Sequence, residues 1–175
     1  MASGDLQRLL DEAAIEKAIC DWCSAIDGRD WDRMRSLIAD PVFIDYSSNG
    51  SLKGLIPAEA WVSRLKILLG FDATLHMVSN FVIALDGDRA TCTSYVNAFH
   101  FLQDRGRELG AYACGVYVHE LERAGDFWKI AGATFKLAGR YSGNEAFQQA
   151  FERARELAPG RTADGPPAAV TTAMP

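Results

Sequence analysis

The strongest constraint on the fold is a pair of long apolar hairpins in the second half of the sequence. Residues 74–85 and 89–102 read as strands and are joined at Asp86-Gly87-Asp88, a strong hairpin signal. Residues 112–122 and 127–137 repeat this arrangement around a turn at residues 123–126. Four long strands that follow one another without intervening helices favour an antiparallel meander, and we expect them to form one curved sheet.

The remaining elements are predicted from apolar spacing and from turn residues. We expect helices at residues 5–27, 30–38, 57–69 and 144–158, and a short strand at residues 42–46. Gly28 is expected to end the first helix as a residue that tolerates positive φ. Asp30 is the expected N-cap of the second helix, and Pro41 is expected to end that helix.

Together these elements predict an α+β domain over residues 1–158, in which a curved antiparallel sheet wraps against the N-terminal helices. The strands are apolar on both faces, so we expect one face to enclose a cavity and the other to meet a helix or a second subunit. A homodimer or homotrimer is therefore expected. The tail over residues 159–175 is rich in Pro, Ala, Thr and Gly and is predicted to be disordered.

Charge and composition exclude several classes of partner. A net charge of −5 argues against binding to nucleic acid or to an anionic membrane surface. No apolar run approaches the length of a bilayer span, and the N-terminal residues lack the order of a signal peptide. We expect a cytoplasmic protein.

The cysteines and histidines form no recognisable metal or redox motif. Cys20 and Cys23 have the spacing of a redox pair, but they lie inside a helical pattern rather than at a helix N-terminus, so we interpret them as buried apolar residues. No second close pair completes a zinc site, and the three histidines lie on separate elements. We expect neither a metal nor a cofactor.

His76 and Asp27 are the residues most indicative of chemistry. Asp27 stands at a helix C-terminus, where the helix dipole disfavours a carboxylate, and His76 stands near a strand start. An aspartate that holds one ring nitrogen of a histidine leaves the other free to move a proton. The alternatives are a His76 ring satisfied by backbone and a solvated Asp27. Asp30 and Asp32 compete as carboxylates but read as cap and surface residues.

Four segments carry a family resemblance. The runs Asp30-Trp-Asp-Arg-Met-Arg-Ser-Leu-Ile38, Ile44-Asp-Tyr46 and Trp128-Lys-Ile-Ala-Gly132, with His76 before a strand, resemble the SnoaL-like family and, within it, the scytalone dehydratases. The family lies in the nuclear transport factor 2 superfamily, and the resemblance therefore implies a cone-shaped barrel of a curved antiparallel sheet packed against N-terminal helices. The resemblance covers residues from about 10 to about 155.

The resemblance implies roles for particular residues. It implies that Asp27 and His76 form an acid/base dyad inside the cone and that Tyr46 assists a substrate carbonyl. It places His100 near a second cavity histidine and puts Cys114 and Val116 where the family has a substrate-contacting serine and asparagine. A second tyrosine of the family corresponds to Ile26 here, so a less polar pocket and a substrate other than scytalone are expected.

Other candidates have two interpretations each. If the strand parity is reversed, Tyr95 and Asn97 face the cavity in place of His100. Trp61 and Phe135 are expected as apolar pocket walls, although each is equally well explained as core. His119 lies near a hairpin end and is expected at the surface.

The resemblance and the residues together predict an enzyme. It would be a lyase of the dehydratase type, or a polyketide cyclase or isomerase, that needs no cofactor and acts on a hydrophobic aromatic or polyketide-like small molecule. The alternative is a non-catalytic binding or dimerisation module of the same fold. Dehydration and cyclisation begin with the same proton abstraction, so both remain open.

Overall fold

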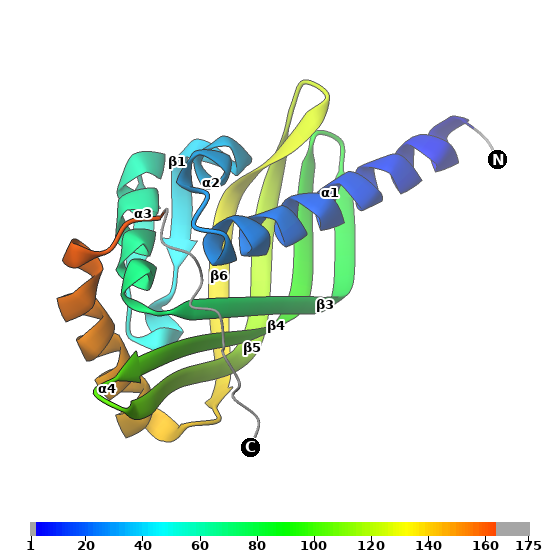
Figure 1. The fold of residues 1–175 in the computed structure, drawn as a ribbon. Coiled ribbons are helices and arrows are strands. Elements are labelled where there is room, and N and C mark those ends of the chain that lie inside the picture. Colours follow the sequence, from blue (N-terminus) through cyan, green and yellow to red (C-terminus); the bar gives the residue numbers. More distant parts are fainter. Residues whose placement is uncertain (1–2, 164–175) are drawn as a thin grey trace, which may run out of the picture.

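The computed structural model describes residues 3–163, which fold as a mixed α+β domain (Figure 1). Its elements follow in the order α1 (Ser3–Asp27), α2 (Trp31–Leu37), β1 (Ile38–Asp45), β2 (Lys53–Ile56), α3 (Ala58–Leu65), β3 (Ala73–Asp86), β4 (Arg89–Asp104), β5 (Arg107–Ala124), β6 (Phe127–Arg140) and α4 (Gly143–Leu157). Residues 158–160 form a short 3-10 turn after α4. The disorder expected over residues 159–175 falls, from residue 164 onward, outside the described residues.

The sheet has six strands in the order β2-β1-β6-β5-β4-β3. The predicted antiparallel meander is confirmed for β3 to β6. The short strand β2 was not predicted, and β1 joins the meander parallel to β6. Figure 1 shows the long strands curving around the helices, and because β2 and β3 remain edges, the sheet is not closed.

One face of the sheet is buried. Along β4 the even-numbered residues from Ala90 to Leu102 are buried, and along β5 the odd-numbered residues from Ala111 to Leu121 are buried. Strand geometry alternates side chains between faces, so one parity points to the helices α1, α2 and α3 and the other points away. This parity puts His100 on the helix side and leaves Tyr95 55% exposed on the outer face.

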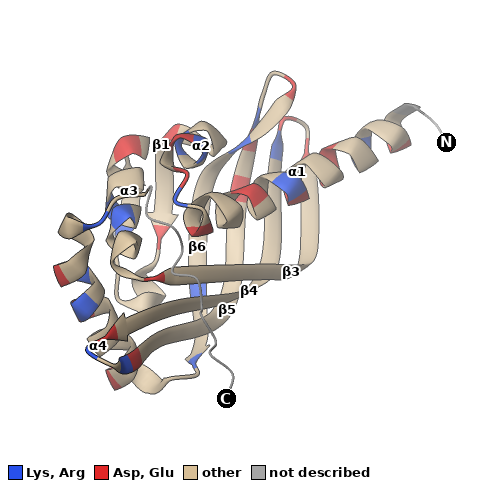
Figure 2. Cartoon of the chain, viewed as in Figure 1, with Lys and Arg blue, Asp and Glu red and all other residues tan. Residues whose placement is uncertain are grey.

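The outer face of the sheet is uncharged over most of its area. Figure 2 shows charged residues on the helices and toward the strand ends, while the middles of β3, β4 and β5 carry none. The outer face instead exposes large apolar side chains, among them Leu75, Met77, Val82 and Tyr95. An uncharged apolar surface of this kind is typical of a face that meets another protein surface.

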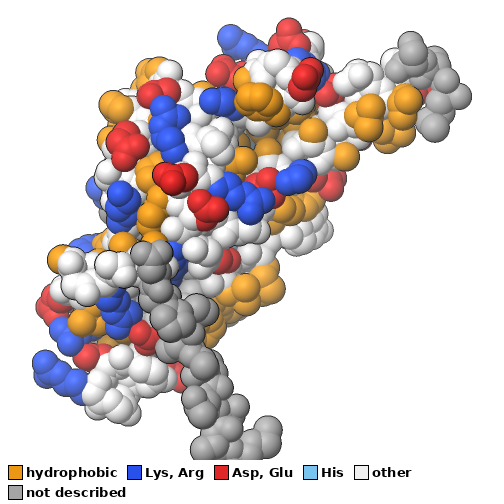
Figure 3. Space-filling view, turned by 45° about the horizontal axis from the view of Figure 1, so that its top comes forward, with side chains coloured by type: hydrophobic (Ala, Val, Ile, Leu, Met, Phe, Trp, Pro, Cys, Tyr) orange, Lys and Arg blue, Asp and Glu red, His pale blue; other side chains and the backbone are white. Residues whose placement is uncertain are grey.

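Helix α1 is fixed to the sheet by a carboxylate near each end. The Arg123 guanidinium on β5 donates two hydrogen bonds, of 2.9 and 2.8 Å, to the Asp11 carboxylate, and Asp27 receives hydrogen bonds from β3. Between them the helix buries Ile15, Ile19, Trp22 and Ile26 against the sheet. Its first turns project beyond the sheet (Figure 1), and Leu6, Leu9 and Leu10 there are each more than half exposed. Figure 3 shows apolar side chains on the surface of this part of the helix.

The end of α1 differs from the prediction in one residue. Gly28 donates its backbone N–H to the Ser24 carbonyl at 2.8 Å, as a helical residue does, and the left-handed conformation falls on Arg29, with φ of 58°. A non-glycine residue adopts this conformation when surrounding contacts hold it there. In this chain the Arg29 guanidinium supplies such contacts by bonding back to the Ile26 carbonyl and across to β3.

The predicted cap of α2 is confirmed, and the helix ends one residue before the predicted end at residue 38. Asp30 Oδ1 accepts a hydrogen bond from the Arg33 backbone N–H at 2.9 Å. The helix ends at Leu37, before Pro41 is reached, because Ile38 already belongs to β1 and is buried against β6. Pro41 lies where the pairing of β1 with β6 is irregular, a place that tolerates a residue without a backbone N–H.

Prediction on packing. Replacing Gly70 by alanine should destabilise the domain by about 1–3 kcal/mol, because a Cβ there would lie 2.0 Å from the Ala154 carbonyl oxygen of α4. Chemical unfolding measures the difference. Gly139→Ala is the control, since a Cβ at Gly139 meets no atom within 4 Å. Equal stability of the two variants would show that the close approach of Gly70 to the Ala154 carbonyl of α4 does not matter for stability.

Candidate active site

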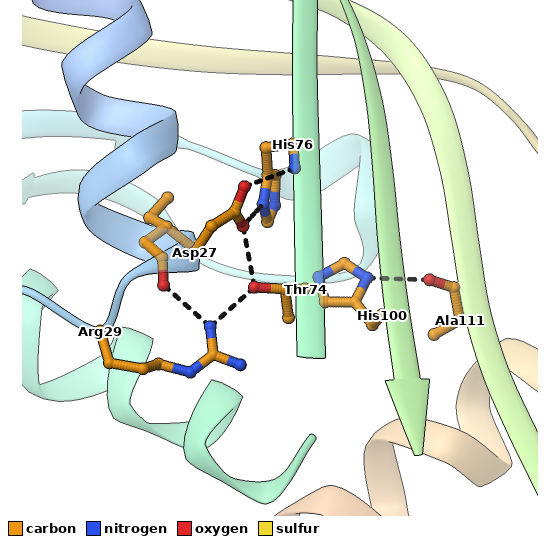
Figure 4. A network of polar contacts seen from close by, with 7 residues as sticks. Asp27, Arg29, Thr74, His76, His100 and Ala111 are labelled. Carbon is orange, nitrogen blue, oxygen red and sulfur yellow. Dashed lines mark hydrogen bonds and ion pairs between the residues drawn. The ribbon is translucent and has the colours of Figure 1, made fainter. Parts of the chain in front are cut away.

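The centre of the candidate site is a carboxylate that holds a histidine by two atoms (Figure 4). Asp27 is the last residue of α1, and His76 lies near the start of β3. Asp27 Oδ1 lies 2.7 Å from His76 Nδ1, and Asp27 Oδ2 accepts the His76 backbone N–H at 2.7 Å. The carboxylate can only accept, so Nδ1 carries the proton and Nε2 is left as the basic nitrogen.

Thr74 and Arg29 extend this pair into a chain of polar contacts. Thr74 Oγ1 donates to Asp27 Oδ1 at 2.8 Å and accepts from Arg29 Nη1 at 2.7 Å. Arg29 Nη1 also donates to the Ile26 carbonyl at 2.8 Å. Figure 4 shows the guanidinium below the threonine, on the side away from the His76 ring. Sequence reasoning missed both residues. Thr74 could have been found because it shares strand parity with His76.

The Asp27 carboxylate is half-buried and charged. Burial raises its pKa, but the hydrogen bonds and charge of His76 and the hydroxyl of Thr74 outweigh this, so the pKa of Asp27 lies below its ordinary value. A carboxylate that stays ionised beside an imidazole stabilises the protonated ring when the ring takes up a proton.

His100 lies beside the pair on the neighbouring strand. Its backbone pairs with Thr74, and the rings of His76 and His100 meet edge to face with centroids 5.3 Å apart. His100 Nδ1 donates to the Ala111 carbonyl at 2.8 Å. Burial, together with the nearby His76, lowers the pKa of His100 to about 3, so the ring is neutral at ordinary pH.

A second group of predicted residues gathers around Tyr46. The ring centroid of Tyr46 lies 5.2 Å from that of Trp61 and 5.7 Å from that of Phe135. Tyr117, which sequence reasoning missed, packs against Tyr46 and Phe135. Burial raises the pKa of Tyr46, against a smaller lowering by a hydrogen bond from Tyr117, so the phenol stays protonated. These residues form an aromatic group.

Cys114 and Val116 lie on the other face of the sheet. The buried residues of β5 have odd numbers, so these two point away from the helices. On that outer side the Tyr141 hydroxyl donates to Asn97 Oδ1 at 3.2 Å. This placement corrects the expectation that they face the cavity. The inward positions beside them are Gly115 and Tyr117.

His119 is buried rather than exposed, which makes the prediction of a surface histidine wrong. β5 extends to Ala124, and His119 shares the inward parity of Tyr117, so its ring lies fully buried against Trp22. The pairing of β5 with β4 decides which side of the strand faces the helices, so no local signal in the sequence revealed this. Burial lowers the pKa of His119 to about 3.

The described residues contain no group of three or more His, Cys, Asp or Glu side chains that could hold a metal ion. Within the same part of the chain, no helix is long and apolar enough to cross a membrane. Of the predicted buried cysteine pair, Cys23 is buried but Cys20 is exposed. A surface hollow of about 520 Å³ lies between the start of α1 and the β3–β4 turn, away from Asp27 and His76.

Comparisons with known proteins agree with this architecture. The family model described as a SnoaL-like domain matches residues 7–134. An uncharacterised protein of Mycobacterium tuberculosis is 31% identical over 122 residues, which cover 69% of this chain and 80% of that protein. Scytalone dehydratase PfmaJ of Pestalotiopsis fici is 24% identical over 157 residues, which cover 83% of this chain and 80% of that enzyme.

Among solved structures, the protein Kfla4162 of Kribbella flavida superposes with a TM-score of 0.73. The two sequences are 25% identical, and the match covers 85% of this chain and 99% of that one. The curved sheet with helices against one face is therefore an architecture that a known protein shares over nearly its whole length.

Prediction on pH. The free energy of unfolding should fall as pH decreases from 6.5 toward about 3. His100 and His119 stay neutral when folded but take up protons in the unfolded chain, so the unfolded state binds more protons throughout this interval and stability rises with pH. Each histidine contributes a slope of about 1.4 kcal/mol per pH unit.

Urea unfolding across this pH interval measures the slope. In His119→Phe the slope should be smaller by about 1.4 kcal/mol per pH unit, the contribution of one proton. The contribution of Asp27 appears only near and below its unfolded pKa of 3.8 and should be retained in this variant. A slope that does not change on substitution would show that His119 is protonated equally in both states.

Proposed function

We propose that this chain, which belongs to the SnoaL-like domain family, is a cofactor-independent lyase of the dehydratase type acting on a hydrophobic aromatic or polyketide-like small molecule. The observation that carries the proposal is the contact of 2.7 Å between Asp27 Oδ1 and His76 Nδ1. A general base needs its proton-accepting atom free and its ring held in one orientation. The contact at Nδ1 orients the His76 ring and leaves Nε2 to accept a proton, and the hydrogen bond from the His76 backbone N–H fixes the Asp27 carboxylate to the same strand.

In the proposed reaction, His76 Nε2 takes a proton from a carbon next to a substrate carbonyl. The electrons of the broken C–H bond form the enolate, and the charge of Asp27 stabilises the imidazolium. The enolate then expels a hydroxyl group from the neighbouring carbon, and the imidazolium returns the proton so that water leaves. No redox step is involved, and the carbon–carbon double bond is the product. Tyr46 is the proposed donor to the carbonyl oxygen.

Thr74 and Arg29 are proposed as positioning residues. Thr74 fixes the Asp27 carboxylate by its hydroxyl, and Arg29 fixes the threonine. The cation also favours the charged form of Asp27, although the two side chains are joined only through Thr74. His100, neutral and edge-on to His76, is proposed to contact substrate beside the base.

The choice of dehydration rests on sequence likeness to a scytalone dehydratase over most of the chain. Ring closure and isomerisation remain open, because both begin with the same proton abstraction. A non-catalytic binding module is the second candidate. It is favoured by Ile26, which stands where the resemblance implies a tyrosine, since fewer polar groups then surround the pair.

Association of copies through the outer sheet face is part of the proposal. Leu75, Met77 and Tyr95 are each about half exposed on a face without charge at its middle. A homodimer or homotrimer that covers this face would bury them. The cytoplasmic location stays a prediction.

Prediction on the pair. Asp27→Asn should lower the rate of dehydration of β-hydroxy aromatic ketones about 10²–10⁴-fold, because the ring loses both its orientation and the charge that stabilises its protonated form. Ultraviolet absorbance of the conjugated product measures the rate, and deuterium uptake next to the carbonyl in D₂O measures proton abstraction alone. Asp30→Asn is the control, because asparagine caps α2 equally well. If the variant at Asp27 exchanged as fast as wild type, the base would lie elsewhere.

Prediction on Thr74. Thr74→Val keeps the shape of the side chain but removes the hydroxyl bonded to Asp27, and should lower the same rate roughly 10-fold, the effect of one hydrogen bond to a charged group. Thr74→Ser, which keeps the hydroxyl, should stay near wild type. Equal rates for the valine and serine variants would remove Thr74 from the mechanism.

A further inference from the structure

Several polar groups are buried in the interior without a hydrogen-bond partner among the described residues. They are Trp22 Nε1, Trp61 Nε1, Ser94 Oγ and both ring nitrogens of His119, besides Nε of Arg140 and of Arg153, whose guanidinium groups have other hydrogen bonds. Trp22, Ser94 and His119 are fully buried and Trp61 is 3% exposed. A buried polar atom that lacks a partner destabilises a fold by about 1–3 kcal/mol, so native proteins retain few of them.

The four residues named first belong to one cluster. The ring centroid of Trp22 lies 6.2 Å from that of Trp61 and 5.6 Å from that of His119. Tyr117 joins the others, since its ring lies 5.1 Å from His119 and its backbone pairs with Ser94 across β4 and β5. The residues that carry the unpartnered atoms therefore come from α1, α3, β4 and β5 but lie in one part of the interior.

The cluster offers more donors than acceptors. An indole N–H can only donate, so Trp22 and Trp61 supply two donors. His119 is neutral and supplies one donor and one acceptor, and the Ser94 hydroxyl can act as either. A partner for this set must bring acceptor oxygens. It must also be uncharged, because none of these four side chains carries a charge that could balance an ion.

The aromatic rings beside the cluster favour a ligand whose acceptor oxygens are attached to a flat, apolar frame. The rings of Tyr46, Tyr117 and Phe135 pack beside the cluster. Trp22 and Asp27 lie on the same helix, five residues apart, which corresponds to about 7–8 Å along the axis. A fused two-ring or three-ring aromatic molecule has a comparable length, so one end could reach His76 while the other reaches the cluster.

We propose that Trp22, Trp61, Ser94 and His119 form a polar subsite, separate from the Asp27–His76 pair, that binds the acceptor oxygens of a neutral flat aromatic ligand. This proposal rests on the proposed function, because the subsite would bind the end of the same substrate that lies away from His76. It names the substrate class more narrowly, as a multi-ring compound with carbonyl or ether oxygens at the end remote from the reacting carbon.

The test compares two ligands that differ by one oxygen. α-Tetralone has a carbonyl on a two-ring frame, and tetralin has the same frame without it. Isothermal titration of the wild-type chain should give binding of α-tetralone about 10-fold tighter than of tetralin. In His119→Phe and in Trp22→Phe this ratio should fall about 5-fold, because each change removes a hydrogen-bonding group while keeping an aromatic ring.

Two further variants test whether the ratio of the affinities for α-tetralone and tetralin depends on the subsite alone. Asp30→Asn, which changes only the cap of α2, should keep the wild-type ratio. Val116→Thr, which adds a hydroxyl on the outer face of the same strand as His119, should also keep it. A ratio near one in wild type, or a ratio unchanged in both His119→Phe and Trp22→Phe, would overturn the proposal.

Thermal unfolding without ligand gives an independent readout. His119→Phe should melt no lower than wild type at neutral pH, because an apolar ring replaces unpartnered polar atoms. A lower melting temperature would mean that buried water already satisfies His119, and would overturn the proposal. The binding ratio does not depend on turnover, so an inactive protein with an intact ratio counts against the proposed reaction alone.

Discussion

The Asp27 carboxylate connects the helical layer to the edge of the sheet. It stands at the C-terminal end of α1, where the helix dipole opposes a negative charge. Three donors from β3 compensate, namely the His76 ring, the His76 backbone N–H and the Thr74 hydroxyl. Because these bonds fix both the strand and the imidazole to the helix, the geometry of the candidate site and the docking of α1 depend on the same carboxylate.

The second constraint is the strand alternation of the long hairpins. Once His100 points to the helices, every second residue of β4 does so, and the pairing of β4 with β5 fixes which residues of β5 join them. That register brings His119 and Tyr117 into the interior and turns Cys114 and Val116 outward. A shift of one residue would exchange the two sets, so the chemistry of the interior is set by register.

The interior is therefore apolar in bulk but carries polar groups at two places. At one, Asp27, Thr74 and Arg29 satisfy one another and hold His76. At the other, the polar atoms of Trp22 and His119 have no hydrogen-bond partner within residues 3–163. A satisfied network rigidifies a site, whereas unsatisfied groups are costly unless something else binds them. The first arrangement suits a reacting group, and the second suits recognition of a ligand.

The sequence by itself determined the helices, the hairpins, the α+β class and the family. These follow from local patterns: apolar spacing, a cap such as Asp30, and turns such as the one at Gly87. It also singled out Asp27 and His76 as partners, from a carboxylate at a helix C-terminus, a lone histidine near a strand start and the positions that the family resemblance implies. Their proposed catalytic role still awaits the exchange experiment.

Only the tertiary structure decided what depends on register and on contacts between distant segments. The left-handed backbone of Arg29 has no local signal, because its guanidinium reaches a threonine 45 positions away. The parallel pairing of β1 with β6, which makes Ile38 a strand residue, is equally non-local. The burial of His119 required the true length and parity of β5, which the turn pattern did not fix. In each case the deciding energy lies in contacts between residues remote in sequence, which no short window of the chain contains.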